Sequence, residues 1–593
     1  MPEFLQDDAG NFAKLKANFE KLDELTKRLV DAIGQKEPSN LDIPTPSSEF
    51  YSKAMMAYFS EVLDNPAKLI EQQVGYWQES VNAWAEAQSR LFSKEDQGTP
   101  STPTKDKRFK SPLWETHPYF SYVKQQYLLS STAIEEATQN LSHLSPSEQR
   151  RIKFFTRQIV DLFAPSNFLA TNPEALNKAV ETGGQSLVDG LEKLVKDLED
   201  NDGRLAVTLT DPDAFEIGKN IATTEGSVVF QNRMFQLIQY KPLTETVFKT
   251  PLLILPPWIN KYYILDMKPE NSMVKYLVEQ GYTVFIVSWV NPDSSYRDVG
   301  IDTYLEEGLL TALNTVLSIT GEEKANIVGY CVGGTLLAIA LAWMAKKKIN
   351  TVKSATFFTT LTDFEDPGEL NVFIEEGFLT GIEKDVDEKG YMDSFYLTRT
   401  FSFLRANDLV YGPAIRSYMM GEAPPVFDLL YWNSDSPNLP ARMTKEYLRG
   451  LYMNNDLAEG RFTICGEKLS LKAIRKPLYA IATESDHIAP WKASFKGLSQ
   501  TRGKSRFILS QSGHIAGVVN PASADKYGHW TNNNKPEDID RWKNEATFAP
   551  TSWWRDWTQW LEGQSGKQES ARIPGSEQYH IIEPAPGSYV VKR

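Results

Sequence analysis

The sequence predicts an α/β fold that follows an all-helical N-terminal region. Three observations lead to this prediction. Six short, almost continuously apolar runs follow residue 245, which is typical of parallel strands covered on both faces. A strand, a glycine-flanked turn and a long apolar helix meet at Cys331. Residues 1–92 contain no strand-like run and few glycines.

The six apolar runs are separated by segments of helical character. They are rich in β-branched and aromatic residues, and their alternation with helices predicts a doubly wound sheet. The candidate strands are 251–256, 282–289, 325–330, 354–359, 477–483 and 506–511.

The N-terminal part of the chain is predicted to be helical in two blocks. In residues 1–92, apolar side chains from Met55 to Trp84 recur at three-and-four spacing. Such a stripe packs on a domain or a partner helix, and adsorption to a hydrophobic surface is the alternative. Residues 93–111 read as a linker. Residues 112–245 hold further helix, including 147–163, and lead into an α/β domain at 246–593.

Composition restricts the class of protein. The 593 residues are enough for two to four units. A formal charge of −14 argues against nucleic acid as the main partner. Two cysteines cannot form a disulfide framework or a zinc cluster. The first residues lack a basic region followed by an apolar stretch, and the longest apolar run, 336–345, is about half of a membrane span. We therefore expect a soluble cytoplasmic protein without a transmembrane segment.

The segment around Cys331 has the pattern of a nucleophile elbow. The candidate strand 325–330 runs through Gly-Tyr-Cys-Val-Gly-Gly into a helix at 335–347, and glycines there remove side chains that would clash in a strained turn. This predicts an α/β-hydrolase fold with cysteine where serine is usual. A helix N-terminus favours a thiolate, which attacks thioesters and carbonyl carbons. The Gly-Tyr-Cys-Val-Gly-Gly sequence therefore indicates acyl transfer. Taken without the other motifs, the same sequence could also hold a buried structural cysteine.

A thiol nucleophile needs a base, and the base needs an orienting group. His514 follows the last candidate strand and Asp486 follows the one before it, which gives the order nucleophile, acid, histidine of the fold. We therefore predict a triad of Cys331, Asp486 and His514. His487 is the competing base, interpreted instead as a residue that lines the cleft, and Glu484 is the competing acid.

The oxyanion hole is predicted from two backbone donors. One is the N–H of Val332, which follows the nucleophile. The other is expected in the loop after the first strand of the sheet, from Trp258 or Ile259, and we take Ile259 as the candidate. No phosphate-binding glycine motif or metal-ligand spacing occurs in the sequence, so the predicted chemistry uses no cofactor or metal.

A long aromatic-rich stretch separates the fourth and fifth candidate strands. Residues 360–475 interrupt the sheet at a point where an insertion covers the site as a cap or lid. An ordinary helical subdomain without gating is the alternative.

Several longer strings together resemble the polyhydroxyalkanoate synthases, and the resemblance extends from about residue 108 onward. The length of the chain and its helical N-terminal region resemble those of the class I enzymes of that family. The matching strings are 167–173, 256–266, 329–334, 427–433, 512–517 and 583–587.

The resemblance implies polymerisation of (R)-3-hydroxyacyl-CoA, chiefly (R)-3-hydroxybutyryl-CoA, through a thioester on Cys331, with release of CoA. Asp486 then either activates the incoming hydroxyl or orients His514, and the sequence leaves both open. The same triad would also serve an acyl-CoA thioesterase or esterase. A scaffold protein with a dead fold is the non-enzymatic alternative, and the complete triad argues against it.

The resemblance also implies roles for residues of the inserted stretch. Arg405 would contact a CoA phosphate, and the alternative for this residue is an ion pair within the cap. Trp432 and Asn455 would line the substrate path, and the alternative for both is a role in packing. Trp258 and Ala406 depart from the family pattern, which is expected to narrow the pocket and loosen the cap loop. Expected partners are the growing polyester and its granule surface, granule-associated proteins, and a second copy that forms a homodimer through the cap.

Overall fold

The computed structural model describes residues 21, 24–29, 31, 106–139, 141, 144–524, 526–532 and 538–592. They form two compact units. Unit 1 takes its described residues from Met1–Asp211 and Arg399–Val426, and unit 2 from Pro212–Thr398 and Phe427–Arg593. The apolar stripe predicted from Met55 to Trp84, and residues 93–105 of the predicted linker, lie outside the described residues.

Unit 1 is built from helices. The helix predicted at 147–163 is confirmed as α6, which begins one residue earlier because Ser145 caps it and Glu148 completes a capping box. Phe109, Trp114 and Phe120 form a small aromatic core. The α-helices of unit 1 are α4 (Leu113–Thr116), α5 (Pro118–Gln139), α6 (Pro146–Leu162), α7 (Pro173–Glu181), α8 (Gln185–Glu199) and α15 (Gly412–Ala414). A further helix, α14 (Ser394–Leu404), crosses the division between the units.

Unit 2 contains a sheet of eleven strands in the order β15-β14-β13-β12-β7-β6-β4-β5-β2-β1-β17. The six central strands are parallel, and they are the six predicted ones, each within two residues at either end. Antiparallel strands extend both sides. The six are β4 (Leu252–Leu255), β5 (Val284–Trp289), β6 (Ala325–Tyr330), β7 (Val352–Phe358), β12 (Leu478–Thr483) and β13 (Ser505–Ser510). The outer strands are β1 (Gly226–Gln231), β2 (Phe235–Tyr240), β14 (His529–Thr531), β15 (Thr547–Ala549) and β17 (Glu583–Pro584).

The hairpin of β1 and β2 corrects the helical prediction for 112–245. All six residues of β2 are buried, and two of them are glutamines, which hides the apolar pattern of a strand. Gln236 donates to Ser588 Oγ at 3.0 Å and accepts from the N–H of Tyr589 at 3.0 Å. The segment that makes these glutamines suitable for burial lies about 350 residues away in the chain.

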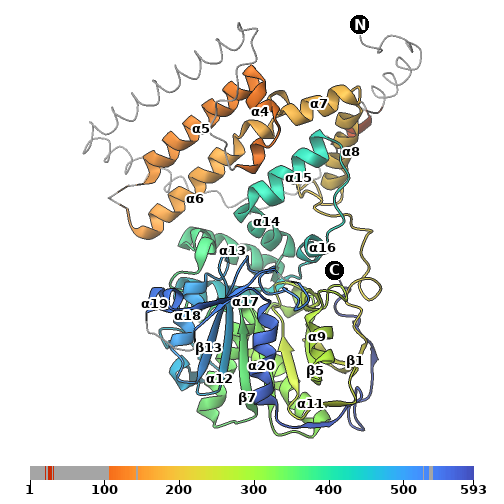
Figure 1. Ribbon diagram of the computed structural model, residues 1–593, viewed down its shortest axis with the longest axis vertical. Coiled ribbons are helices and arrows are strands. Elements are labelled where there is room, and N and C mark those ends of the chain that lie inside the picture. The colour runs from red at the N-terminus through yellow and green to blue at the C-terminus, as the bar shows by residue number, and fades with distance from the viewer. Residues whose placement is uncertain are drawn as a thin grey trace. The chain divides into compact units, whose positions relative to one another are not determined.

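Helices pack against both faces of the parallel strands. On one face of β7, Thr356 Oγ1 accepts from Trp557 Nε1 of α20 at 3.1 Å, and the Phe358 ring also packs on Trp557. On the other face, Phe357 and Ala338 of α12 line the same small cavity. Figure 1 shows this layered arrangement in unit 2. The helices are α9 (Met273–Glu279), α10 (Ile301–Thr303), α11 (Thr311–Thr320), α12 (Val332–Lys347), α13 (Glu376–Lys389), α16 (Asp428–Ser434), α17 (Ala441–Lys445), α18 (Trp491–Ser499), α19 (Ile539–Asn544) and α20 (Trp553–Ser565).

The stretch between β7 and β12 is divided between the units. Residues 399–426 belong to unit 1, while α13, α16, α17 and a π-helix at Glu446–Met453 belong to unit 2. The expectation that 360–475 acts as a cap or lid stays a prediction.

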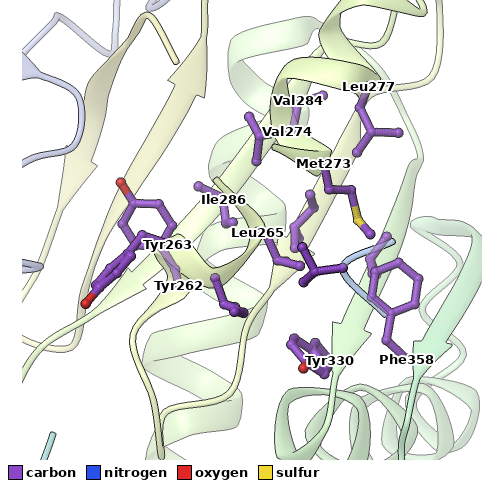
Figure 2. Packing of buried hydrophobic residues seen from close by; sticks show 14 of the residues in the cluster. Tyr262, Tyr263, Leu265, Met273, Val274, Leu277, Val284, Ile286, Tyr330 and Phe358 are labelled. Atoms are coloured by element: carbon purple, nitrogen blue, oxygen red, sulfur yellow. The ribbon is translucent and has the colours of Figure 1, made fainter. Parts of the chain in front are cut away.

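The main core of unit 2 joins the sheet to α9 and to the residues after β4. Figure 2 shows Val284 and Ile286 of β5 packed near Val274 and Leu277 of α9. Tyr330, at the end of β6, belongs to the same cluster, so the strand that carries the elbow is fixed by the core. Among the described residues, no helix is long and apolar enough to cross a membrane.

Candidate active site

Cys331 stands between β6 and α12 in a strained conformation. Its φ of 53° and ψ of −121° lie where residues other than glycine are rarely found. Its N–H donates to Phe358 O at 2.9 Å, and its carbonyl accepts from the N–H of Thr335 at 3.2 Å. The backbone of the strained residue is thus held by β7 and α12, and the thiol is half-buried at the first turn of the helix.

The glycines around Cys331 are required by close backbone approach. A Cβ on Gly329 would lie 2.5 Å from Gly334 Cα. A Cβ on Gly333 would overlap the carbonyl oxygen of Leu255, and one on Gly334 would overlap the Thr360 side chain. The turn can therefore be this tight only because side chains are absent on its inner side.

Asp486 and His514 are brought together from the loops after β12 and β13. Asp486 Oδ2 lies 2.7 Å from His514 Nδ1, with the Asp486 side chain fully buried and the His514 side chain 10% exposed. Asp486 Oδ1 accepts from the N–H groups of Ile488 at 2.9 Å and Ala489 at 2.8 Å. The carboxylate is therefore fixed independently of the histidine.

The charges of Asp486 and His514 stabilise each other. Burial works against ionisation of Asp486, but the charge and hydrogen bond of His514 hold the pKa of this carboxyl below its usual range. Burial lowers the pKa of His514, but the charge of Asp486 and the hydrogen bond that the ring donates to this carboxylate, with a smaller contribution from Cys331, raise it to about 10. The buried carboxylate of Asp486 thus favours an imidazolium at His514.

The competing residues lie in other surroundings. Glu484 is exposed, and its Oε1 accepts from Lys543 Nζ at 3.2 Å. His487 is partly buried, and its carbonyl accepts from the N–H of Glu369 at 3.1 Å. Cys465 lies in the turn between two short strands, where burial and Glu306 raise the pKa of its thiol to about 11. Of the two histidines considered, His514 is the one whose ring contacts Asp486.

The loop after β4 lies against the first turn of α12, because a Cβ on Gly333 would meet Leu255 O and Pro256 O. Val332 is the first residue of α12, so its N–H has no intrahelical acceptor. Trp258 and Ile259 are both buried in the facing loop. The Trp258 ring is stacked on Tyr304 at a centroid distance of 4.4 Å, which fixes the loop on its inner side.

Three tyrosines near Cys331 escaped the sequence analysis. The Tyr330 ring stacks on the His514 ring at 5.9 Å. Tyr447 and Tyr452, on the π-helix Glu446–Met453, have hydroxyls 3.4 Å apart, and both interact electrostatically with Cys331. Burial, together with the charge of Cys331, raises the pKa of both phenols, so they remain protonated donors. Tyr447 and Tyr452 lie in the aromatic-rich stretch 360–475, where the sequence does not distinguish them from aromatic residues of the core.

The residues expected to bind substrate have structural contacts. Trp432 is buried and its Nε1 donates to Lys261 O at 2.7 Å. Asn455 has a φ of 51°, accepts from the N–H of Phe364 at 2.8 Å, and donates to Asp363 at 3.0 Å. Arg405 is exposed and belongs to unit 1.

Two family models match the chain. One is described as "Poly-beta-hydroxybutyrate polymerase (PhaC) N-terminus" and matches residues 105–277. The other, described as "alpha/beta hydrolase fold", matches residues 250–521 and agrees with the predicted fold class.

Characterised relatives match over nearly the whole chain. A poly(3-hydroxyalkanoate) polymerase of Methylorubrum extorquens is 42% identical over 89% of this chain and 87% of its own length. A poly(3-hydroxyalkanoate) polymerase subunit of Cupriavidus necator is 42% identical over 88% of each chain. One from Rhizobium etli is 40% identical over 90% of this chain and 84% of its own length.

Proposed function

The chain belongs to the poly(3-hydroxyalkanoate) polymerase family, and on that premise we propose that it polymerises (R)-3-hydroxyacyl-CoA into polyhydroxyalkanoate, with release of CoA. It is an acyltransferase of the α/β-hydrolase fold. The observation that supports the proposal most directly is a cysteine on the strained elbow, together with a histidine held at 2.7 Å by a buried aspartate.

In the first step, Cys331 Sγ attacks the carbonyl carbon of the acyl-CoA thioester. A new C–S bond to Cys331 forms, the bond to the CoA sulfur breaks, and the leaving thiolate takes a proton from His514. The raised pKa of His514 supports this role, because an imidazolium is present at neutral pH to stabilise the Cys331 thiolate and to protonate CoA.

In the second step, the 3-hydroxyl of another hydroxyacyl unit attacks the Cys331 thioester. An ester bond forms, the C–S bond breaks, and the hydroxyl proton passes to His514. The 2.7 Å contact between Asp486 and His514 supports an orienting role for Asp486 over direct activation of the hydroxyl, because Oδ2 already faces the ring and Oδ1 is occupied by the backbone.

The tetrahedral intermediate of each step needs donors for its oxyanion. The N–H of Val332 is one proposed donor, and the N–H of Ile259 is the other. The close approach of the loop after β4 to the first turn of α12 supports this pair. The raised pKa values of Tyr447 and Tyr452 keep their hydroxyls protonated, and the proposed role of these hydroxyls is to assist a thiolate or an incoming hydroxyl.

Several parts of the proposal rest on family membership. Arg405 would contact CoA, while His487, Trp432 and Asn455 would line the substrate path. We also propose a preference for short acyl groups, a homodimer formed through the cap, and a cytoplasmic location at the surface of polyester granules with granule-associated proteins. The proposed steps use no cofactor beyond the CoA of the substrate, and no metal.

The test is to supply purified protein with (R)-3-hydroxybutyryl-CoA and to follow thiol release, then to separate soluble from insoluble product. We expect CoA release with an insoluble polyester of high mass, abolished by Cys331→Ala. Cys465→Ala is the matched control and should retain activity. Release of CoA with only soluble hydroxyacid would instead identify the thioesterase alternative.

A further inference from the structure

A buried ion pair holds the loop after β4, residues 256–266, on its outer side. Lys261 Nζ lies 2.7 Å from Asp435 Oδ1, and the two side chains are only 7% and 9% exposed. Asp435 directly follows helix α16. Because both charges lose hydration on burial, such a pair is maintained only where further hydrogen bonds compensate for the loss.

Both charged groups have such additional partners. Asp435 Oδ2 accepts from the hydroxyl of Tyr263 at 3.0 Å, so the carboxylate binds the loop twice. Lys261 Nζ also donates to Lys592 O at 2.9 Å, which connects the loop to the segment 583–592. The ammonium group therefore joins three separate parts of unit 2.

Two further hydrogen bonds connect the same loop to the end of α16. Trp432 Nε1 donates to Lys261 O at 2.7 Å, and Asn260 Nδ2 donates to Ser436 Oγ at 2.9 Å. The backbone and side chain of Lys261 are thus both fixed from α16. The polar contacts between the loop and the end of α16 come from residues 260–263, just after the proposed donor Ile259.

On its inner side the loop faces the nucleophile. The carbonyls of Leu255 and Pro256 lie against the first turn of α12, as the space around Gly333 shows. Ile259 is two residues before Lys261, so a shift of the anchor would move the Ile259 N–H relative to the carbonyl carbon bound at Cys331. An oxyanion donor acts only when it is held at the position where the charge develops.

We propose that Lys261 and Asp435 are positioning residues that fix the second oxyanion donor of the acyl-transfer site. This inference rests on the proposed function, because it concerns the same oxyanion. The pair binds Tyr263 and the carbonyl of Lys592. Its loss therefore slows attack on an acyl carbonyl but leaves the reactivity of the sulfur itself.

The chain offers a matched control pair. Lys268 Nζ lies 3.2 Å from Asp428 Oδ2, and this pair joins a residue just after the loop to the first residue of the same helix α16. It differs from the first pair in its distance along the chain from Ile259 and in exposure, since the Lys268 side chain is 34% exposed. A general requirement for ion pairs between these segments would affect both pairs.

The experiment compares two reactions of Cys331 in the full-length protein. Alkylation by iodoacetamide needs the thiolate but no oxyanion hole, while acylation by (R)-3-hydroxybutyryl-CoA needs both. The test variant is Lys261→Met with Asp435→Leu, which removes both charges and leaves no unpaired one. The control variant is Lys268→Met with Asp428→Leu. Mass spectrometry assigns the adduct to Cys331, because Cys465 is the other thiol in the chain.

We expect the test variant to keep its alkylation rate within about twofold, and its KM to change little, while kcat for CoA release falls on the order of 10- to 100-fold, approaching the loss of one oxyanion donor. The control variant should keep all three values. Lys261→Arg should recover part of kcat, because it restores the charge.

Equal kcat in a folded test variant and in the unsubstituted protein would overturn the inference, and so would equal losses in the test and control variants. If the double variant does not fold, Asp435→Asn, which keeps the shape of the side chain, takes its place with the same expected split. A Cys331→Ala protein that still releases CoA would contradict the proposed function itself, which is a different outcome from any of these.

Discussion

Asp486 Oδ2 lies 2.7 Å from His514 Nδ1, and both groups are buried at the ends of adjacent parallel strands, β12 and β13. The pairing of these strands sets the separation of the two loops, so the contact follows from the register of the sheet. Asp486 and His514 are 28 positions apart in the chain, a separation that spans helix α18 and strand β13.

Asp486→Asn should lower kcat for CoA release by about 100-fold or more, since the amide can hold the ring in the wrong tautomer and no longer stabilises the imidazolium. Steady-state CoA release measures this effect. Asp486→Glu keeps the charge and should retain more activity than Asp486→Asn. Equal activity in these two variants would contradict the orienting role.

The same pair makes stability depend on pH in a defined direction. The folded pKa of His514, about 10, is above the unfolded value of about 6.5, so the folded state alone holds the proton between these pH values. The stabilisation is fully present below about pH 6.5 and is lost as pH rises towards 10. Urea denaturation measures the free energy of unfolding of the unsubstituted protein and of Asp486→Asn. The difference between the two values should be largest near pH 6 and should approach zero above pH 10. A difference that grows with pH would contradict the assignment.

Gly329→Ala should destabilise the fold by more than about 2 kcal/mol, because the new Cβ would lie 2.5 Å from Gly334 Cα and neither backbone can move without breaking the elbow. Thermal unfolding measures this loss. Gly563→Ala, at an exposed position of α20 with open space around it, is the control and should stabilise by about 0.5–1 kcal/mol. A Gly329→Ala protein as stable as the parent would show that the elbow tolerates rearrangement.

Tyr452→Phe should move the pH profile of Cys331 alkylation to higher pH. Burial raises the pKa of the Tyr452 phenol and the charge of Cys331 raises it further, so we expect removal of the hydroxyl to take a donor away from the thiolate. Iodoacetamide labelling between pH 5 and 10 measures the profile. Tyr479→Phe is a control for a buried phenol elsewhere in the sheet, hydrogen-bonded to Asp556 at 2.9 Å, and should leave the profile unchanged. Identical profiles for Tyr452→Phe and the parent would remove this residue from the site.

Asn455→Ala should lower stability by about 1–3 kcal/mol, because it leaves the buried N–H of Phe364 without its acceptor. Asn455→Gly also loses the amide but adopts the φ of 51° without strain, so it should be less destabilised than the alanine variant. Thermal unfolding and KM are measured together. A raised KM with unchanged stability would instead support the substrate-binding role expected from family resemblance.

The sequence predicted those parts of the fold whose local pattern and tertiary surroundings agree. The six parallel strands are buried on both faces and therefore read as apolar runs. The elbow was predictable because strained turns require glycine at fixed positions. The order of Asp486 and His514 after successive strands then located the acid and the base without knowledge of distances.

The remaining features depend on contacts between distant residues. The strand β2 was missed because Gln236 and Gln239 are satisfied by backbone and side chains beyond residue 570. The pair of Lys261 and Asp435 has no local pattern, since 174 residues separate its members. Tyr447 and Tyr452 resemble ordinary core aromatics until the nearby thiol is located in space.

The large sheet of unit 2 ends in its shortest strands. At one edge β17 has two residues, and its Pro584, paired with Ser227, has no N–H to offer another chain. At the other edge β15 has three residues. An edge this short presents few free backbone groups, so the long parallel core cannot be extended by strands of neighbouring molecules. Resistance to edge-to-edge aggregation is thus built into the two ends of the sheet, far in sequence from the parallel strands that need protection.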